Sequence, residues 1–169
     1  KDFKYPVHGD FAPHYRANQI AALLKAREGW KPDDFIAVQK DVYSQFSHFL
    51  AQEVVKAFDR KKPTNSELPA AVNVLRGWNG QMDKDAAAPM VVSLAFQKLR
   101  TKIVNRAAPG RAASYLDQMS PAVMERLLRE RPKEWFADWD KVLIECLDEA
   151  IEDREGRRAQ GSDFSRWQY

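Results

Sequence analysis

Apolar residues recur along most of the chain at the three- to four-residue spacing of a helix that buries one face. The first predicted helix follows Pro13 and ends at Gly29, with Ile20 and Leu23 on its apolar side. The residues before it, 1–13, contain prolines and a glycine without helical periodicity, so they predict an extended lead-in.

The widest apolar pattern follows Pro32 and predicts one continuous helix that ends near Phe58. Its apolar residues form two neighbouring stripes: Phe35, Val38, Val42, Phe46 and Phe49, and beside them Ile36, Tyr43, Leu50 and Val54. A helix that is apolar over so wide an arc has to be covered on more than one side.

Four shorter patterns predict further helices, at about 67–78, 87–105 and 121–131, and a last one that contains Trp139 through Ile151. Asn65 or Ser66 is the expected cap of the first, and Ser120 followed by Pro121 is a typical start for the third. No segment alternates apolar and polar residues over a useful length, as a half-buried strand does. The sequence therefore predicts an all-α fold.

Composition supports a single unit of ordinary domain size, since 44% of the 169 residues are apolar. The 27 basic and 24 acidic residues give a net charge of only +3, which calls for no acidic partner such as a nucleic acid. Cys146 is the single cysteine, so neither an intrachain disulfide nor a cysteine metal cluster is possible. No apolar run approaches the ~20 residues of a membrane-spanning helix, and we expect a soluble chain.

Asp41, Ser44 and His48 have the residue types of a hydrolytic triad and would share one face of the long predicted helix. A serine in the middle of a helix, however, has neighbouring N–H groups that are already hydrogen-bonded, so no donors remain for an oxyanion hole. We therefore interpret Ser44 as an internal polar contact.

The remaining candidates for chemistry are isolated. The three histidines, His8, His14 and His48, lack the spacing of metal ligands. Asp10 could contribute to a calcium site, although a single carboxylate in a loop is more often a turn residue or a helix cap. The aromatic group Trp135, Phe136 and Trp139 is more typical of a core or an interface than of a ligand site.

Several short motifs occur in a definite order along the chain. They are Tyr5–Pro6 with Asp10, Arg16 to Ile20 (Arg-x-x-x-Ile), Gln39 to Ser44 (Gln-x-Asp-x-x-Ser), Leu75 to Gly80 (Leu-x-x-Trp-Asn-Gly), the alanine-rich Ala86 to Phe96, and Trp167 to Tyr169. In their order and spacing these motifs resemble the penicillin acylase family of N-terminal nucleophile hydrolases. Asn79 replaces the family's usual aspartate, a mild change because either side chain can stabilise a turn.

The resemblance implies that the chain is a helical subdomain, 1–169, from the β-chain of an enzyme with an αββα core. Residues 1–13 would be the lead-in, 14–158 the helices and 159–169 a tail that returns to that core. Such enzymes hydrolyse N-acyl amides with an N-terminal serine whose own α-amino group is the base. Because that serine and the oxyanion-hole asparagine would lie outside the chain, we expect it to be inactive alone.

Arg16 matches a family arginine that supports the oxyanion-hole region; the alternative is a helix-start arginine paired to a carboxylate. The resemblance further implies a periplasmic or secreted location, and calcium is possible in the parent although no cofactor is expected within this chain. The implied partners are the α-chain and the β-chain core of the parent. The charge balance and the apolar pattern predict neither a nucleic acid nor a membrane as partner. Apolar side chains left uncovered are expected among Phe3, Phe11, Trp135, Phe136, Phe164 and Trp167. A free-standing helical interaction module is the alternative function.

Overall fold

The computed structural model describes residue 4 and residues 13–152. This part of the chain contains α1 (Tyr15–Lys25), α2 (Asp34–Lys40), α3 (Gln45–Lys61), α4 (Leu68–Arg76), α5 (Ala87–Ala107), the short 3-10 helices η1 (Ala112–Ser114) and η2 (Leu116–Gln118), α6 (Pro121–Glu130) and α7 (Trp139–Ile151). Within these ranges the extended pairing is a single bridge between Tyr43 and Gln81, and no strand forms. The predicted all-α class is confirmed.

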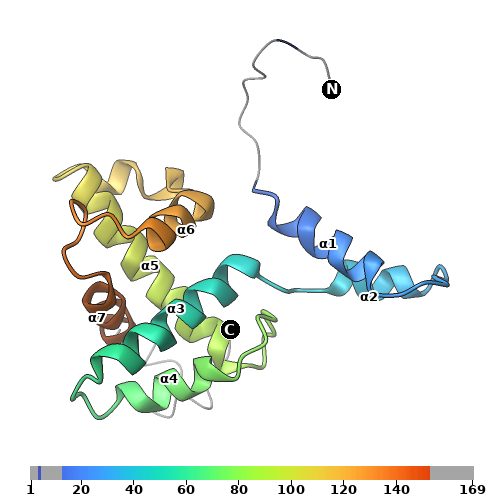
Figure 1. Ribbon diagram of the computed structural model, residues 1–169, viewed down its shortest axis with the longest axis horizontal. Helices are drawn as coiled ribbons and strands as arrows, with labels where there is room; N and C mark the ends of the chain where they lie inside the picture. The colour runs from blue at the N-terminus through green and yellow to red at the C-terminus, as the bar shows by residue number, and fades with distance from the viewer. Residues whose placement is uncertain (1–3, 5–12, 153–169) are drawn as a thin grey trace.

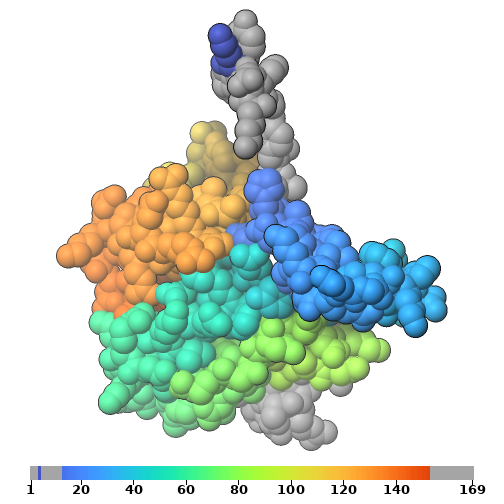
Figure 2. Space-filling model, turned by 45° about the vertical axis from the view of Figure 1, so that its right-hand side comes forward, coloured from blue at the N-terminus to red at the C-terminus, as the bar shows by residue number. Residues whose placement is uncertain are grey.

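The described helices form two parts, a body made of α3–α7 and an arm made of α1, α2 and the turn between them. Figure 1 shows the arm to one side of the body, connected to it by the extended residues before α3. In the body, α7 packs chiefly on α5 and α3, while α4 and α6 flank this centre. Figure 2 shows the arm, in blue, as a ridge that stands out from the surface beside α3.

The core lies where α3, α5 and α7 meet, with contributions from α4 and α6. Its largest fully buried side chains are Leu50, Val54, Leu68, Val72, Leu99, Ile103, Met124, Leu128, Leu143, Leu147 and Ile151. Many follow one another at four-residue spacing, so they line one face of their helix. Burying each such side chain contributes about 1.5–3 kcal/mol before the cost of ordering the chain is subtracted.

Helix starts follow the predicted capping chemistry in one case and differ in another. The hydroxyl of Ser120 accepts a hydrogen bond from the N–H of Ala122 at 3.3 Å, and Pro121 is the first residue of α6. The start of α4 differs, because its N-cap is Glu67, which forms no side-chain cap bond. Asn65 instead accepts a bond from the Glu67 N–H at 3.0 Å and forms the turn that leads into the helix.

The prediction of one helix from Pro32 to Phe58 is wrong. The chain leaves the helix after Lys40, and α3 begins at Gln45. Ser44 is the N-cap of α3, with an extended backbone at φ −110° and ψ 100°. The intervening residues bond across to a distant segment: the Ser44 N–H donates to the Gly80 carbonyl at 2.9 Å, and the Met82 N–H to the Val42 carbonyl at 3.0 Å.

Around this break, apolar side chains of α2 and of the connection to α3 are exposed. Phe35, Ile36 and Val42, which the single helix would have placed on covered stripes, are 41%, 49% and 48% exposed. The other exposed large apolar side chains of the described residues are Leu24, Tyr115 and Val123.

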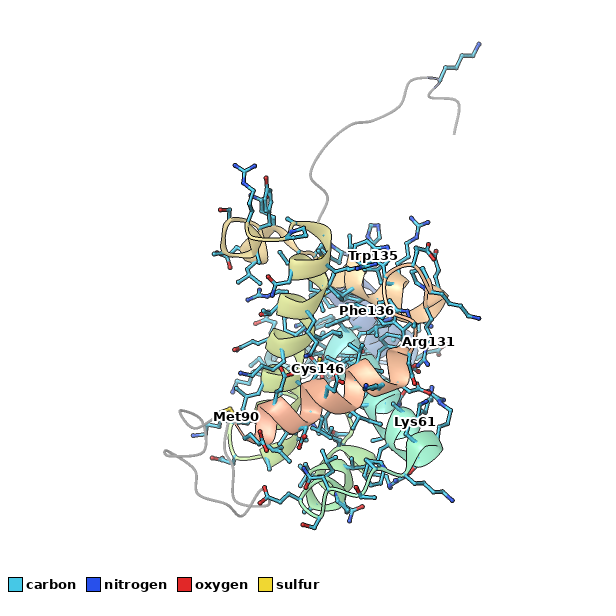
Figure 3. The ribbon with its side chains drawn as sticks, turned by 90° about the vertical axis from the view of Figure 1, so that its left-hand side faces the viewer. Lys61, Met90, Arg131, Trp135, Phe136 and Cys146 are labelled. Atoms are coloured by element: carbon cyan, nitrogen blue, oxygen red, sulfur yellow. The ribbon has the colours of Figure 1, made fainter. Side chains whose placement is uncertain are left out.

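The predicted uncovered aromatic residues near the last helix are partly buried instead. Trp135 and Phe136 lie in the connection between α6 and α7 (Figure 3) and pack against the edge of the core. The Phe136 ring meets Trp139 edge to face, with ring centroids 4.9 Å apart. The other four predicted residues, Phe3, Phe11, Phe164 and Trp167, lie outside the described residues. Among the described helices, none is long and apolar enough to cross a membrane.

Candidate functional site

Three of the sequence motifs meet at the junction of the arm and the body. Arg16 comes from the first turn of α1, Asp41 from the end of α2, and Gln81 from the residue that follows the Trp-Asn-Gly turn. These three side chains, which we call the Arg16 cluster, are joined by hydrogen bonds. Segments 25 and 40 residues apart in the sequence are thereby brought into contact.

The guanidinium of Arg16 binds the carboxyl end of α2. Its Nη1 donates to the main-chain oxygen of Asp41 at 2.9 Å and to the Asp41 Oδ2 at 3.3 Å. Its Nη2 donates to the carbonyl oxygens of Val38 at 2.9 Å and Gln39 at 3.4 Å. The last carbonyls of a helix have no partner inside it and carry partial negative charge, so a cation there is favourable.

Asp41 connects Arg16 to the body. Its second oxygen, Oδ1, accepts a hydrogen bond from Gln81 Nε2 at 2.8 Å. The Asp41 side chain is only 10% exposed, whereas that of Arg16 is 47% exposed. The carboxylate is thus covered and bonded on both oxygens, while the guanidinium is held on one side and open to solvent on the other.

The turn at Trp78–Gly80 fixes the main chain of Gln81. Asn79 Oδ1 accepts from the Gln81 N–H at 3.0 Å, and Trp78 Nε1 donates to the Gln81 carbonyl at 2.9 Å. Gly80 has φ +85°, in the left-handed region that glycine adopts without strain. The Asn79 side chain thus stabilises the turn by its bond to the Gln81 N–H.

A second set of contacts fastens the arm to α6. The hydroxyl of Tyr15 donates to Glu125 Oε2 at 2.5 Å, and the Tyr15 ring lies 6.5 Å from that of Phe46. Burial and, after it, the bond to the Glu125 carboxylate raise the pKa of Tyr15 well above its usual value. The tyrosine therefore remains a neutral hydrogen-bond donor at any physiological pH.

Asp41, Ser44 and His48 do not come together as a triad. Asp41 is bonded to Arg16 and Gln81, and Ser44 donates to the Ser47 hydroxyl at 2.8 Å. His48 meets the Tyr43 hydroxyl through Nδ1 at 3.0 Å and Gln52 through Nε2 at 3.2 Å. Ser44 is a polar contact as expected, but it caps α3 and does not lie in the middle of a helix, so that part of the sequence argument is wrong.

The remaining predicted site residues form no metal site among the described residues. Asp10 and His8 lie outside the described residues, so calcium stays a prediction for the parent protein. His14 is the N-cap residue of α1 and forms no side-chain cap bond. Within the described ranges, no three His, Cys, Asp or Glu side chains gather as a metal site would require.

Asp140, a carboxylate whose pKa is strongly lowered, belongs to an ion-pair network between α3 and α7. Asp140 accepts from Arg60 at 2.6 and 2.7 Å and from Arg131 at 2.6 Å, and Arg131 also donates to Glu53 at 2.7 Å. The hydrogen bonds from Arg60 and then Arg131, opposed by burial, lower the pKa of Asp140 to about 2. Arg131 (Figure 3) lies just after α6, so the network joins three helices.

A surface pocket of about 450 Å³ lies at the carboxyl end of α5, between Val104 and Met119. Its walls are mostly apolar and include Ala107, Ala108 and Tyr115. It shares no residue with the Arg16 cluster. Sequence reasoning singled out Arg16 and both motifs that hold it, but not Gln81, whose only signal was its place directly after the Trp-Asn-Gly turn.

Comparison with known protein families identifies the chain. The model of the Penicillin amidase family matches residues 1–169, the whole chain, and so includes every motif that meets at the Arg16 cluster. No curated protein matches the chain. Since the family match extends over the full length, this chain belongs to the penicillin amidase family.

Proposed function

We propose that the chain is the helical part of the β-chain of a penicillin acylase-type enzyme that hydrolyses N-acyl amides. Membership of the penicillin amidase family supports a hydrolase. In this proposal the nucleophile is an N-terminal serine in another part of the parent, within an αββα core, and the parent is periplasmic or secreted. The helical part binds that core and brings Arg16 to the active site.

The observation that carries this role is that Arg16 is held in place and still half exposed. Four acceptor atoms on Val38, Gln39 and Asp41 fix one side of the guanidinium, and 47% of the side chain stays accessible. A cation that is already oriented stabilises developing negative charge without reorganising during the reaction. Arg16 would act in this way by supporting the oxyanion-hole region of the parent.

The helical part by itself lacks the means for catalysis in this proposal. A hydrolytic serine needs a base within hydrogen-bond reach and donors for the oxyanion. Ser44, the serine of the Asp41, Ser44 and His48 set, accepts from the Ser47 N–H at 3.3 Å and serves as a helix cap. We therefore expect the isolated chain to show no turnover of N-acyl substrates.

The test compares the parent enzyme with its Arg16→Ala variant. We expect kcat to fall on the order of tenfold or more if the guanidinium supports transition-state charge. Arg27→Ala is a matched control, because Arg27 lies on the same arm and pairs with Asp34, and its side chain forms none of the hydrogen bonds that join the Arg16 cluster. Unchanged kcat in Arg16→Ala, or turnover by the isolated chain that is lost in Ser44→Ala, would refute the proposed roles.

A free-standing interaction module remains the second candidate, and the exposed Phe35, Ile36 and Val42 favour it. The coding sequence that flanks the chain distinguishes the two functions. An upstream processing site that begins with serine supports the hydrolase, whereas its absence supports the module.

Calcium in the parent, with Asp10 as a ligand, is a further proposal. Removing calcium with a chelator and then measuring activity and stability tests it.

A further inference from the structure

We propose that Asp41 is a positioning residue, which acts on the reaction by fixing the orientation of the Arg16 guanidinium. The inference rests on the proposed function of Arg16 and adds the group that holds it. Asp41 provides both acceptors of Arg16 Nη1, its main-chain oxygen at 2.9 Å and its carboxylate at 3.3 Å. Among the described residues, it is also the one negatively charged acceptor of the guanidinium.

Arginine needs such a partner because its long side chain has many rotamers in water. The carbonyls of Val38 and Gln39 hold Nη2, and Asp41 holds Nη1, so contacts on two nitrogens fix the plane of the group. In the part of the chain that the structure describes, no acceptor contacts Nε of Arg16. That edge of a five-donor group therefore remains available to a partner outside the described part.

Asp41 can orient Arg16 because both of its own carboxylate oxygens are hydrogen-bonded. Oδ1 is bonded to Gln81 at 2.8 Å, and the side chain is 10% exposed. The two carboxylate oxygens therefore have separate partners, Arg16 on Oδ2 and Gln81 on Oδ1. The main chain of Gln81 is in turn bonded to Trp78 and Asn79 in the adjacent turn, so a chain of hydrogen bonds runs from the body through Asp41 to the arm.

The consequence is a defect in rate with little defect in substrate binding. Asp41→Asn keeps the shape and one acceptor oxygen but removes the charge that aligns Arg16. Misplacement of a catalytic group by about 1 Å can cost on the order of a hundredfold in rate, and we expect a fall in kcat of roughly fivefold to a hundredfold. KM should change little, since an interaction made mainly in the transition state affects kcat.

The experiment uses the full parent enzyme with Asp41→Asn, Arg16→Ala and the double variant, and measures kcat, KM and the urea midpoint of each. We expect the single variant Asp41→Asn to have a lower kcat with an unchanged KM. In the Arg16→Ala background the same substitution should cause no further loss of kcat. Asp34→Asn is the matched control, because Asp34 pairs with Arg27 on the same arm, and should leave kcat unchanged. If Asp41→Asn fails to fold, Gln81→Met takes its place, with a smaller loss that is also absent in the Arg16→Ala background.

The outcomes separate the two levels of the proposal. Unchanged kcat in Arg16→Ala refutes the function proposed for Arg16. A slow Arg16→Ala enzyme together with a fully active Asp41→Asn enzyme overturns the positioning role alone. The same role is overturned if Asp41→Asn loses further rate in the Arg16→Ala background, or if its loss of rate disappears under conditions that restore its urea midpoint.

Discussion

Replacing Gly80 by alanine tests how tightly the Trp78–Gly80 turn packs on α3. A Cβ atom at position 80 would lie 2.4 Å and 2.8 Å from two ring carbons of Tyr43 and 2.9 Å from Cβ of His48. These neighbours cannot move easily, since the Tyr43 hydroxyl bonds to His48 at 3.0 Å and His48 belongs to α3. The backbone at φ +85° adds strain for any residue with a side chain.

The two effects can be given separate magnitudes. A left-handed backbone costs an alanine roughly 1–2 kcal/mol, and an overpacked site costs about 1–3 kcal/mol more. Together they predict a loss of about 2–5 kcal/mol for Gly80→Ala, out of a total stability on the order of 5–15 kcal/mol. For a chain of this size that corresponds to a fall in Tm of roughly 4–20 °C.

Two other glycines provide controls for the urea unfolding curves, followed by circular dichroism. Gly29 has φ +70°, and nothing lies within 4 Å of the place that a Cβ atom would take, so Gly29→Ala should show the strain alone, about 1–2 kcal/mol. Gly77 has φ −97° and open space, so Gly77→Ala should change stability by less than about 1 kcal/mol. A Gly80→Ala protein no less stable than Gly29→Ala would refute the packing of this turn.

Three further outcomes are expected. The pKa of Asp140 is lowered to about 2 from 3.8, so its ion pairs stabilise the fold above pH ~4, and about 1–2 kcal/mol of this stability is lost as the pH falls toward 2. In Asp140→Asn the urea midpoint should therefore depend less on pH between pH ~5 and ~2.5 than in the unchanged protein, and an equal dependence contradicts this. Burial raises the pKa of Cys146 to about 12, so a thiol reagent at pH 8 should label it only after unfolding, and rapid labelling of the folded chain argues against a buried thiol. The exposed arm should promote self-association that Ile36→Glu reduces, which sedimentation tests; a strict monomer at high concentration opposes it.

The sequence predicted the elements whose signals are local. Ser120 and Pro121 set the start of α6, and the predicted helix from 87 to 105 agrees with α5 (Ala87–Ala107) to within two residues. The break between α2 and α3 could not be predicted, because apolar spacing continues through it while its cause is the pairing of Val42 and Ser44 with a turn about forty residues away. Helical periodicity carries no information about such a partner.

The candidate site shows the same division. Arg16, the Gln-x-Asp-x-x-Ser segment and the Trp-Asn-Gly turn were each identified separately. That they are one hydrogen-bonded cluster follows only from the fold, because each bond joins segments far apart in the sequence. The sequence interpretation of Arg16 as a residue paired to a carboxylate agrees with its bond to Asp41, and its supporting role in catalysis stays a prediction.

The long-range fastening of the arm has a consequence for synthesis on the ribosome. The arm is synthesised before the body, but Tyr15 can bond to Glu125 only after a further 110 residues have been synthesised. At a synthesis rate of about 5–20 residues per second, that partner arrives roughly 5–20 s later. Throughout this delay Phe35 and Ile36, which stay 41% and 49% exposed even after folding, present an apolar surface to the cell. Of the described helices, those of the arm are therefore the ones that a chaperone would meet first on the nascent chain.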